Sequence, residues 1–459
     1  MIDFQRFTIP FTRTVLTARI LFVFAFLFLC ASCSMQKKIS RSADETVLNA
    51  PALKTAHVGI SIYEPATHKY WFDYQGDKYF VPASNTKIPT LYTAMKYLGD
   101  SLEGLRYVAF DNANKERTYW IQATGDPTLL HPDYKKQPVI DFLKKDTSAT
   151  YLLIGANQWE DSPWGAGWAW GDYSAYYMAE RSQLPVYGNV VHVFGSEKGI
   201  NIVPNHFDWG YGGNDNDSIF SLQKNKYNFR RDMKQNRFVW TKANNAVVHE
   251  EIPFITSLQM SADLLRDTIA GLKLSLFPNT TPLNAKTIYS QPADSMFRPL
   301  MHRSDNFFAE QCLQMVSFKL FGVMNDAKVI DTILKTDFKD LPQKPRWADG
   351  SGLSRYNLFT PQDFVAILGK IKEQFGMNRV KNIFATGGTG TISSYYKADS
   401  SYIYGKTGTL SGVVAFSGYL TTKKNKQLIF SVLVNNHNAS STDVRRAVEK
   451  FLESVRNNF

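Results

Sequence analysis

The chain has 459 residues, of which 44% are hydrophobic and 20% are charged, and its formal net charge is +11. This length suffices for two or more domains, and the composition excludes a mostly disordered chain. The basic balance suits an anionic partner such as a membrane or an acidic polymer, or reflects lysines spread over a soluble surface. Without zinc-finger spacing or a dense basic run, we expect no nucleic-acid partner. Without a His-x-x-x-His pair, we expect no metal site and no cofactor.

The N-terminus has the pattern of an export signal. Two arginines precede an apolar run at 20–29, which is too short to span a bilayer comfortably, and small residues lead to Cys33. This order resembles a bacterial lipoprotein cleavage site, although Cys30 stands where that motif usually has Leu. We therefore expect a signal peptide at 1–32, a lipid on Cys33 and a polar tether at 33–55. These features predict an exported protein of the cell envelope or periplasm, anchored to a membrane by the lipid.

The two ends of the chain predict one antiparallel sheet with helices on it. Strand-like runs at 58–63 and 70–74 form a hairpin, and three more runs lie between 401 and 434. A closing helix at 442–456 carries an apolar stripe. The long middle of the chain has short strand-like runs and many Gly, Asn and Asp turns. We therefore predict an α+β main domain built from 56–105 and 286–459, with a β-rich insertion of one or two subdomains at 106–285.

A hydroxyl group and a lysine lie where the first long helix is predicted to begin. Ser84 precedes Lys87 by three residues, and apolar residues at helical spacing continue to about Leu98. This separation places both side chains on one helix face, where Lys87 can take the proton of Ser84. A free lysine is neutral in only about one molecule in a few thousand at pH 7, so burial or other cations must lower its pKa. Alone the motif is weak, because an N-capping serine and a surface lysine have the same spacing.

A second motif, Ser304-Asp305-Asn306, lies between two amphipathic stretches. Ser304 can relay a proton, and Asn306 can hold the lysine or a substrate amide.

A third motif, Lys406-Thr407-Gly408-Thr409, lies in a predicted strand. Lys406 is a second cation, which we expect to lower the pKa of Lys87 and to attract a substrate carboxylate. Gly408 lets the strand approach the substrate without a side chain. The backbone N–H groups of Ser84 and Thr409 can then bind a developing oxyanion.

Ser-x-x-Lys, Ser-x-Asn and Lys-Thr-Gly in this order are associated with penicillin-binding proteins and serine β-lactamases. The 220 residues between Ser84 and Ser304 exceed what a compact β-lactamase needs. The chain resembles the class C low-molecular-mass penicillin-binding proteins, D-alanyl-D-alanine carboxypeptidases/endopeptidases, over essentially its mature length. Three further strings carry the resemblance: 125–129 (Gly-Asp-Pro-Thr-Leu), 304–310 (Ser-Asp-Asn-Phe-Phe-Ala-Glu) and 349–355 (Asp-Gly-Ser-Gly-Leu-Ser-Arg).

The resemblance implies a penicillin-binding/β-lactamase-like fold and an acyl-enzyme serine peptidase. Its substrates would be peptidoglycan stem peptides, and β-lactams would acylate it. The implied roles are Ser84 as nucleophile, Lys87 as base, Ser304 and Asn306 as second motif, Lys406 and Thr407 as third motif, and Thr409 as closure of the oxyanion hole. Arg355 would meet substrate or brace a loop, and Asp161 is a candidate, by position only, to contact the side-chain amine of the stem peptide.

Two alternatives remain open at this stage. A β-lactamase-like or esterase hydrolase would share the motifs but needs fast deacylation, for which no sequence feature is evident. An inactive envelope protein could bind peptidoglycan through the insertion, although a binding module has no need for all five polar residues. The balance of carboxypeptidase and endopeptidase activity, the stem-peptide preference, the oligomeric state and the role of the tryptophans at 159–170 also remain open.

Overall fold

A computed structural model describes residues 36–155, 158–196, 199–211, 226–246, 249–278, 284–398 and 400–459. The predicted signal peptide and the lipidation candidate Cys33 lie outside these residues. Within the described part of the chain, no helix combines the length and the apolar character that crossing a membrane requires.

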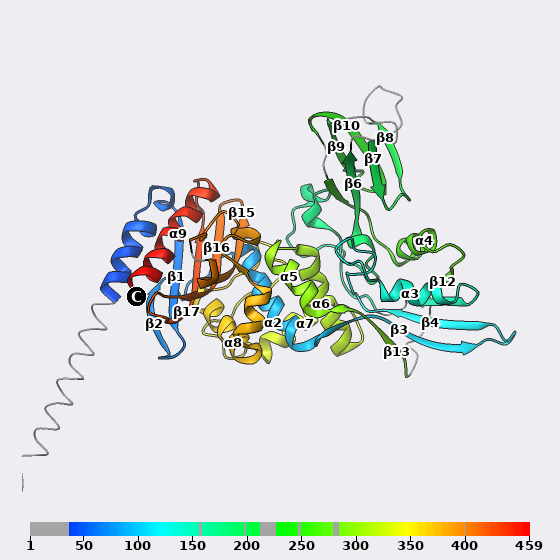
Figure 1. The fold of residues 1–459 in the computed structure, drawn as a ribbon, viewed down its shortest axis with the longest axis horizontal. Helices are drawn as coiled ribbons and strands as arrows, with labels where there is room; N and C mark the ends of the chain where they lie inside the picture. Colours follow the sequence, from blue (N-terminus) through cyan, green and yellow to red (C-terminus); the bar gives the residue numbers. More distant parts are fainter. Residues whose placement is uncertain are drawn as a thin grey trace, which may run out of the picture.

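One antiparallel sheet joins the two ends of the chain, as the sequence predicts (Figure 1). The N-terminal hairpin pairs with the last strand of the chain, so that Val58 lies opposite Val434. The third motif lies in a strand that begins at Ile403 and continues to Leu410, beyond the predicted run. In sheet order the strands are β14 Ala385–Thr386, β15 Ile403–Leu410, β16 Val413–Thr421, β17 Gln427–Asn435, β1 His57–Glu64 and β2 Lys69–Tyr74.

Helices cover both faces of this sheet because side chains alternate along its buried central strands. In β17, Ile429 and Leu433 face one hydrophobic core, whereas Phe430 and Val432 face another. The first core contains residues of α2 Lys87–Tyr97, α5 Ala293–His302, α6 Asn306–Phe321, α7 Asp326–Lys335 and α8 Pro361–Ile383. The second core contains residues of α9 Ser441–Asn458, the closing helix that the sequence predicts.

The N-terminal segment also belongs to the second core, which differs from the polar tether predicted at 33–55. Residues 36–43 are helical and lead into a short π-helix, Asp44–Leu48, which lies beside α9 (Figure 1). Ile39, Ala43 and Val47 are fully buried. Their spacing of four residues makes one narrow apolar stripe, which the surrounding lysines and serines obscure in the composition.

The insertion leaves the main domain after α2 and returns at α5. Its first sheet has a core of its own, shared with α3 Pro138–Lys145 and α4 Leu258–Thr268. β3 begins before residue 106, so this strand crosses the predicted domain boundary. In sheet order the strands are β12 Lys273–Phe277, β5 Thr150–Ile154, β4 Arg117–Ala123, β3 Ser101–Asp111 and β13 Lys286–Pro292.

Two three-stranded sheets form the rest of the insertion and stand together at its upper end in Figure 1. One has the order β11 His249–Pro253, β6 Val190–Ser196 and β7 Gly199–Val203. The other has the order β8 Asp208–Tyr211, β10 Arg237–Ala246 and β9 Lys226–Arg231. Residues of both sheets share the core of the five-stranded sheet, so the described insertion is one packed unit.

Candidate active site

Ser84 and Lys87 lie at the start of α2, as the sequence predicts. Ser84 sits in a short 3-10 turn, Ala83–Thr86, that leads directly into the helix at Lys87. Nζ of Lys87 lies 3.0 Å from Oγ of Ser84. Lys87 is fully buried, whereas Ser84 is half-buried and lines a cavity. A ligand in the cavity can therefore reach the Ser84 hydroxyl, and the Lys87 amine lies behind that hydroxyl, shielded from solvent.

Two further oxygen atoms surround the Lys87 amine. Oδ1 of Asn306 lies 2.6 Å from it and the carbonyl oxygen of Ser351 lies 2.7 Å from it. Both atoms can only accept hydrogen bonds, and the Asn306 orientation is fixed because its Nδ2 donates to the Tyr177 carbonyl at 2.9 Å. A neutral amine has two N–H groups for these two acceptors. Its lone pair is then left for the hydroxyl proton of Ser84.

Burial allows the neutral form of the Lys87 amine to be populated near neutral pH. It lowers the pKa of Lys87 to about 8, against the opposing effect of the Asp349, Glu310 and Asp305 carboxyls. Of the two causes that the sequence left open, burial and a nearby cation, the structure assigns the lowered pKa of Lys87 to burial, and Lys406 does not contribute to it. The charge effect acts in the other direction, because burial and then Lys87 lower the pKa of Lys406 well below its ordinary value.

Ser304 joins the second motif to the third. Nζ of the fully buried Lys406 donates to Oγ of Ser304 at 2.8 Å and to the Thr407 carbonyl at 2.6 Å. Ser304 has a left-handed backbone, with φ of 62°. Asp305 follows as the N-cap of α6, where its Oδ1 accepts from the Phe308 N–H at 3.0 Å. The middle residue of Ser-x-Asn thus starts the helix while its two neighbours face the lysines.

Gly408 lets β15 pass close to the turn that carries Ser84. A Cβ atom at this position would lie 2.6 Å from the Pro82 carbonyl oxygen and 2.9 Å from the backbone nitrogen of Ser84. Thr409, the next residue, is exposed and lines the cavity, and its Oγ1 accepts from Nη2 of Arg445 at 2.5 Å. The absence of a side chain therefore brings the backbone of β15 beside the Ser84 N–H, as an oxyanion site requires.

Thr407 contacts a segment that lies outside the three motifs. Its Oγ1 donates to Oγ1 of Thr391 at 2.7 Å. Thr391 comes from the Gly-Gly-Thr-Gly-Thr segment at 387–391. The structure therefore places the segment at 387–391 against the third motif.

Five of the predicted residues border a cavity of about 1050 Å³ between the main domain and the insertion, whereas Lys87, Lys406, Thr407 and Gly408 are buried and do not line it. Ser84, Ser304, Asn306, Arg355 and Thr409 line one part of it. Nη2 of Arg355 also donates to the Ser411 carbonyl at 2.8 Å, so this arginine both lines the cavity and braces a loop.

Asp161 is not among the residues that line the cavity. It is largely buried and its carboxylate pairs with Arg181 at 3.1 Å and accepts from Gln314 at 2.5 Å. Arg181 also pairs with Asp326 and lies 3.6 Å from Glu310. The structure thus gives Asp161 a place in a buried ionic network rather than at a substrate.

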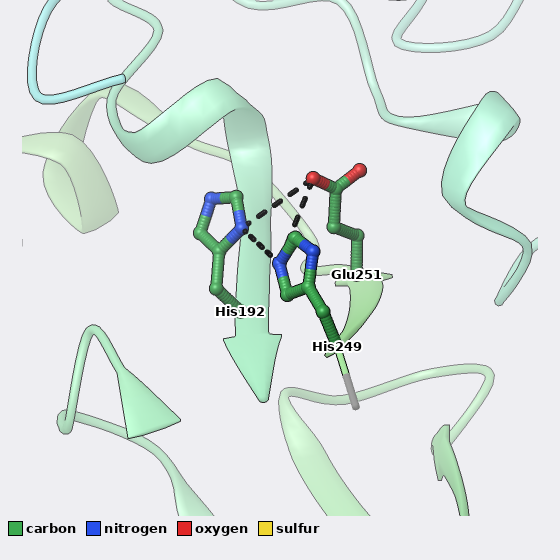
Figure 2. Close-up of side chains that lie close together, drawn as sticks. All are labelled: His192, His249 and Glu251. Carbon is green, nitrogen blue, oxygen red and sulfur yellow. Dashed lines mark hydrogen bonds and ion pairs between the residues drawn. The ribbon is translucent and has the colours of Figure 1, made fainter. Parts of the chain in front are cut away.

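One cluster of possible metal ligands borders the same cavity (Figure 2). His192 comes from β6, and His249 and Glu251 come from β11. Burial lowers the pKa of His192 to about 4 and raises the pKa of Glu251 above its ordinary value. The expectation of no metal site depends on helical His-x-x-x-His spacing, a pattern that does not include ligands brought together by two paired strands.

Comparison with known proteins agrees with this geometry. A family profile described as the D-Ala-D-Ala carboxypeptidase 3 (S13) family matches residues 39–204 and 277–455. The chain belongs to this family. The resemblance to low-molecular-mass penicillin-binding proteins that the motifs indicate is thereby confirmed.

Relatives of this S13 family member match along most of their length. The D-alanyl-D-alanine carboxypeptidase DacB of Haemophilus influenzae is 22% identical, with 84% of this chain and 86% of the relative covered. A D-alanyl-D-alanine carboxypeptidase of Actinomadura sp. is 25% identical, with 86% and 80% covered. The crystal structure of penicillin binding protein 4 (dacB) from Haemophilus influenzae has a TM-score of 0.69 at 18% identity and covers 92% of this chain and 98% of that chain. This structure confirms the predicted fold.

Proposed function

We propose that this chain is a serine-type D-Ala-D-Ala carboxypeptidase that acts on peptidoglycan stem peptides through an acyl-enzyme at Ser84. Membership of the S13 family supports the reaction class. One observation carries the mechanism: Nζ of the buried Lys87, with its lowered pKa, lies 3.0 Å from Oγ of a serine that opens to the cavity. A protein that only binds peptidoglycan needs no such pair.

In the acylation step, neutral Lys87 takes the hydroxyl proton as Oγ of Ser84 attacks the carbonyl carbon of the penultimate D-alanine. The carbonyl oxygen becomes an oxyanion, which accepts hydrogen bonds from the backbone N–H groups of Ser84 and Thr409. Each such donor is worth roughly 10²–10³ in rate. The C–N bond then breaks, the leaving amine takes a proton through Ser304, and D-alanine departs.

Deacylation uses the same groups with water in place of the amine. Lys87 takes a proton from water, whose oxygen attacks the ester carbonyl, and Oγ of Ser84 leaves and recovers a proton. The shortened stem peptide is released with a new carboxylate. Endopeptidase action would cut a cross-link by these same steps, with a peptide amine as the leaving group.

We propose that the terminal carboxylate is bound at the third motif, whose Thr409 lines the cavity while Lys406 and Thr407 are buried directly behind it. Lys406 is buried beside Ser304, and Thr407 is held by Thr391. A β-lactam offers a carboxylate and a reactive amide in similar relation, so we expect it to acylate Ser84. Its leaving amine stays tethered to the acyl group, which favours a long-lived adduct.

The test is intact mass spectrometry of residues 34–459 after incubation with a fluorescent penicillin, for wild type and Ser84→Ala. We expect a long-lived one-to-one adduct in wild type and none in the variant. An intact penicillin with no adduct would contradict the mechanism. Destroyed penicillin with no adduct would instead indicate a β-lactamase.

We also propose that the chain is exported and anchored to a membrane by a lipid on Cys33. The basic, apolar and small-residue order of the N-terminus supports this proposal. Mass spectrometry of the N-terminal peptide from a membrane fraction tests it. A diacylated peptide beginning at Cys33 is expected, and an unmodified peptide that retains residues 1–32 would contradict it.

A further inference from the structure

The cluster of His192, His249 and Glu251 is built by the register of two paired strands. β6 and β11 are antiparallel neighbours, and His192 lies directly opposite Glu251. His249 precedes Glu251 by two residues, so both side chains lie on the same face of β11. Figure 2 shows the three side chains converging from these two strands.

The three facing atoms have the spacing of a metal site. Nδ1 of His192 lies 3.3 Å from Nε2 of His249 and 3.5 Å from Oε1 of Glu251, and the last two atoms are 3.8 Å apart. Ligand atoms bound to Zn²⁺ at about 2.0–2.2 Å in a tetrahedron lie about 3.3–3.6 Å from one another. The observed triangle therefore matches one face of a zinc tetrahedron to within a few tenths of an ångström.

The hydrogen bonds of His192 prepare its Nδ1 for a cation. Its other nitrogen, Nε2, lies 3.2 Å from the Tyr187 carbonyl oxygen, which can only accept, so Nε2 carries the proton. The ring is 2% exposed, and burial favours its neutral form. Nδ1 then has only a lone pair, and it faces a carboxylate oxygen of Glu251. A hydrogen bond to a backbone carbonyl is also the usual way in which proteins orient a metal-binding histidine.

With Glu251 ionised and no cation bound, Nδ1 of His192 and Oε1 of Glu251 share the single N–H that Nε2 of His249 can offer. The surroundings add further negative charge. Asp133 and Asp305 line the same cavity as Glu251, and Arg303, which also lines it, pairs with both of these carboxylates. A bound cation would satisfy all three facing atoms at once and would balance the excess of carboxylates.

We propose that His192, His249 and Glu251 bind one Zn²⁺ ion, whose fourth position opens to the cavity and takes a carboxylate of the substrate. All three side chains border the cavity that contains Ser84, which leaves the fourth position accessible. The family profile matches residues 39–204 and 277–455, so His249 and Glu251 fall between its two parts. The carboxylate half of the proposal rests on the proposed peptidase function, whereas metal binding does not.

Metal binding is tested by calorimetric titration of the full chain, produced without a histidine tag and freed of metal with a chelator. One Zn²⁺ per wild-type chain is expected, and His249→Ala and Glu251→Gln should each weaken binding at least about tenfold. The matched control is His206→Ala, because His206 lies in the same insertion but pairs with Asp267 outside the cluster. Equal affinity in all four proteins, or no binding to wild type, would overturn the site.

A second measurement guards against variants that do not fold. Co²⁺ added to the wild-type chain should give the intense visible absorption of a four-coordinate ion, and the weak spectrum of a six-coordinate ion would overturn the proposed geometry. The rate of penicillin acylation at Ser84 is recorded for every sample. That rate tests the peptidase function independently of metal. A failure of the proposed metal site can therefore be distinguished from a failure of the proposed peptidase function.

The carboxylate half is tested with two stem peptides that differ only in whether a side-chain carboxylate is free or amidated. Zn²⁺ should lower KM at least about threefold for the free carboxylate and leave KM of the amidated peptide unchanged. Equal KM values with and without Zn²⁺ for both peptides would overturn this half, while calorimetry still decides the metal site.

Discussion

The indole Nε1 of Trp168 donates a hydrogen bond to Oδ2 of Asp349 at 2.9 Å, and this bond connects the insertion to the Lys87 site. Asp349 is fully buried and also accepts from the backbone N–H groups of Gly352 and Ser354 at 2.8 and 2.6 Å. These bonds close a tight loop around Ser351. The carbonyl oxygen of Ser351 is one of the two acceptors that hold the Lys87 amine. A tryptophan of the insertion thus helps to position the general base of the main domain.

Trp168→Phe should slow acylation by benzylpenicillin about three- to tenfold and lower stability by about 1.5–3 kcal/mol. The variant keeps an aromatic ring but removes a donor to a buried carboxylate. Acylation is measured by quenched intact mass spectrometry, and stability by urea unfolding. Trp170→Phe is the matched control, since Trp170 lies in the same loop with 71% of its surface exposed. Identical rates for both variants would show that the insertion does not position the loop.

Acylation should depend on pH through Lys87. The neutral amine is the active base, and burial sets the pKa of Lys87 at about 8. The second-order rate constant for benzylpenicillin should therefore rise between about pH 7 and pH 9 and reach half of its plateau near pH 8. Lys96→Met should give the same curve, because Lys96 pairs with Asp337 at the far end of α2. A rate constant that is flat from pH 6 to pH 9 would contradict Lys87 as the base.

The sequence predicts the central parts of this site because they depend on local spacing and on strand pattern. Ser84 and Lys87 share a helix face through a separation of three residues, and β15 carries Lys406 in a recognisable strand. The chain ends are recognisable as strands because β1 alternates apolar residues with small or polar ones, and β16 and β17 are short, largely apolar runs bounded by polar turns. The helix motif and each single strand can be recognised within about ten residues.

The sequence could not predict contacts that depend on the pairing of distant segments. Asp161 lies in a loop two residues after Trp159, and its partner Arg181 becomes apparent only in the folded insertion. His192 and Glu251 meet because β6 and β11 pair in one particular register. The buried stripe of Ile39 and Val47 is too short to stand out among polar neighbours. In each case tertiary packing, and not local propensity, determines which residues come into contact.

Gly408→Ala should reduce the acylation rate about 10²–10³-fold. The new Cβ would lie 2.9 Å from the Ser84 nitrogen, so β15 must move away from the oxyanion site or block it. Gly171→Ala is the matched control, because nothing lies within 4 Å of a Cβ there and its backbone suits any residue. Acylation kinetics and the thermal midpoint are measured together. A Gly408→Ala enzyme of unchanged rate would contradict the close approach of the two backbones.

Arg181→Met should destabilise the protein by about 3–5 kcal/mol in urea unfolding, because it leaves a buried cluster of carboxylates without their cation. Arg181 lies in the insertion, and Asp326 and Glu310 belong to helices of the main domain. Methionine keeps the apolar part of the side chain, so the loss of stability measures the effect of removing the positive charge. Arg41→Met is the control for removing an exposed ion pair and should not move the unfolding midpoint.

The loss on removing Arg181 should also depend on pH, with a sign that follows from the carboxyls. Burial raises the pKa of Asp326 to about 6 and that of Glu310 to about 8 in the folded protein. Both lie above the unfolded values near 4, so the folded state binds more protons in this range and stability falls as pH rises. Arg181 lowers the pKa of both carboxyls, so its removal raises these pKa values further, and the folded variant binds more protons than the folded wild type as pH rises. Arg181→Met should therefore lose more stability at pH 9 than at pH 5, and an equal loss at both values would show that the network does not carry this charge.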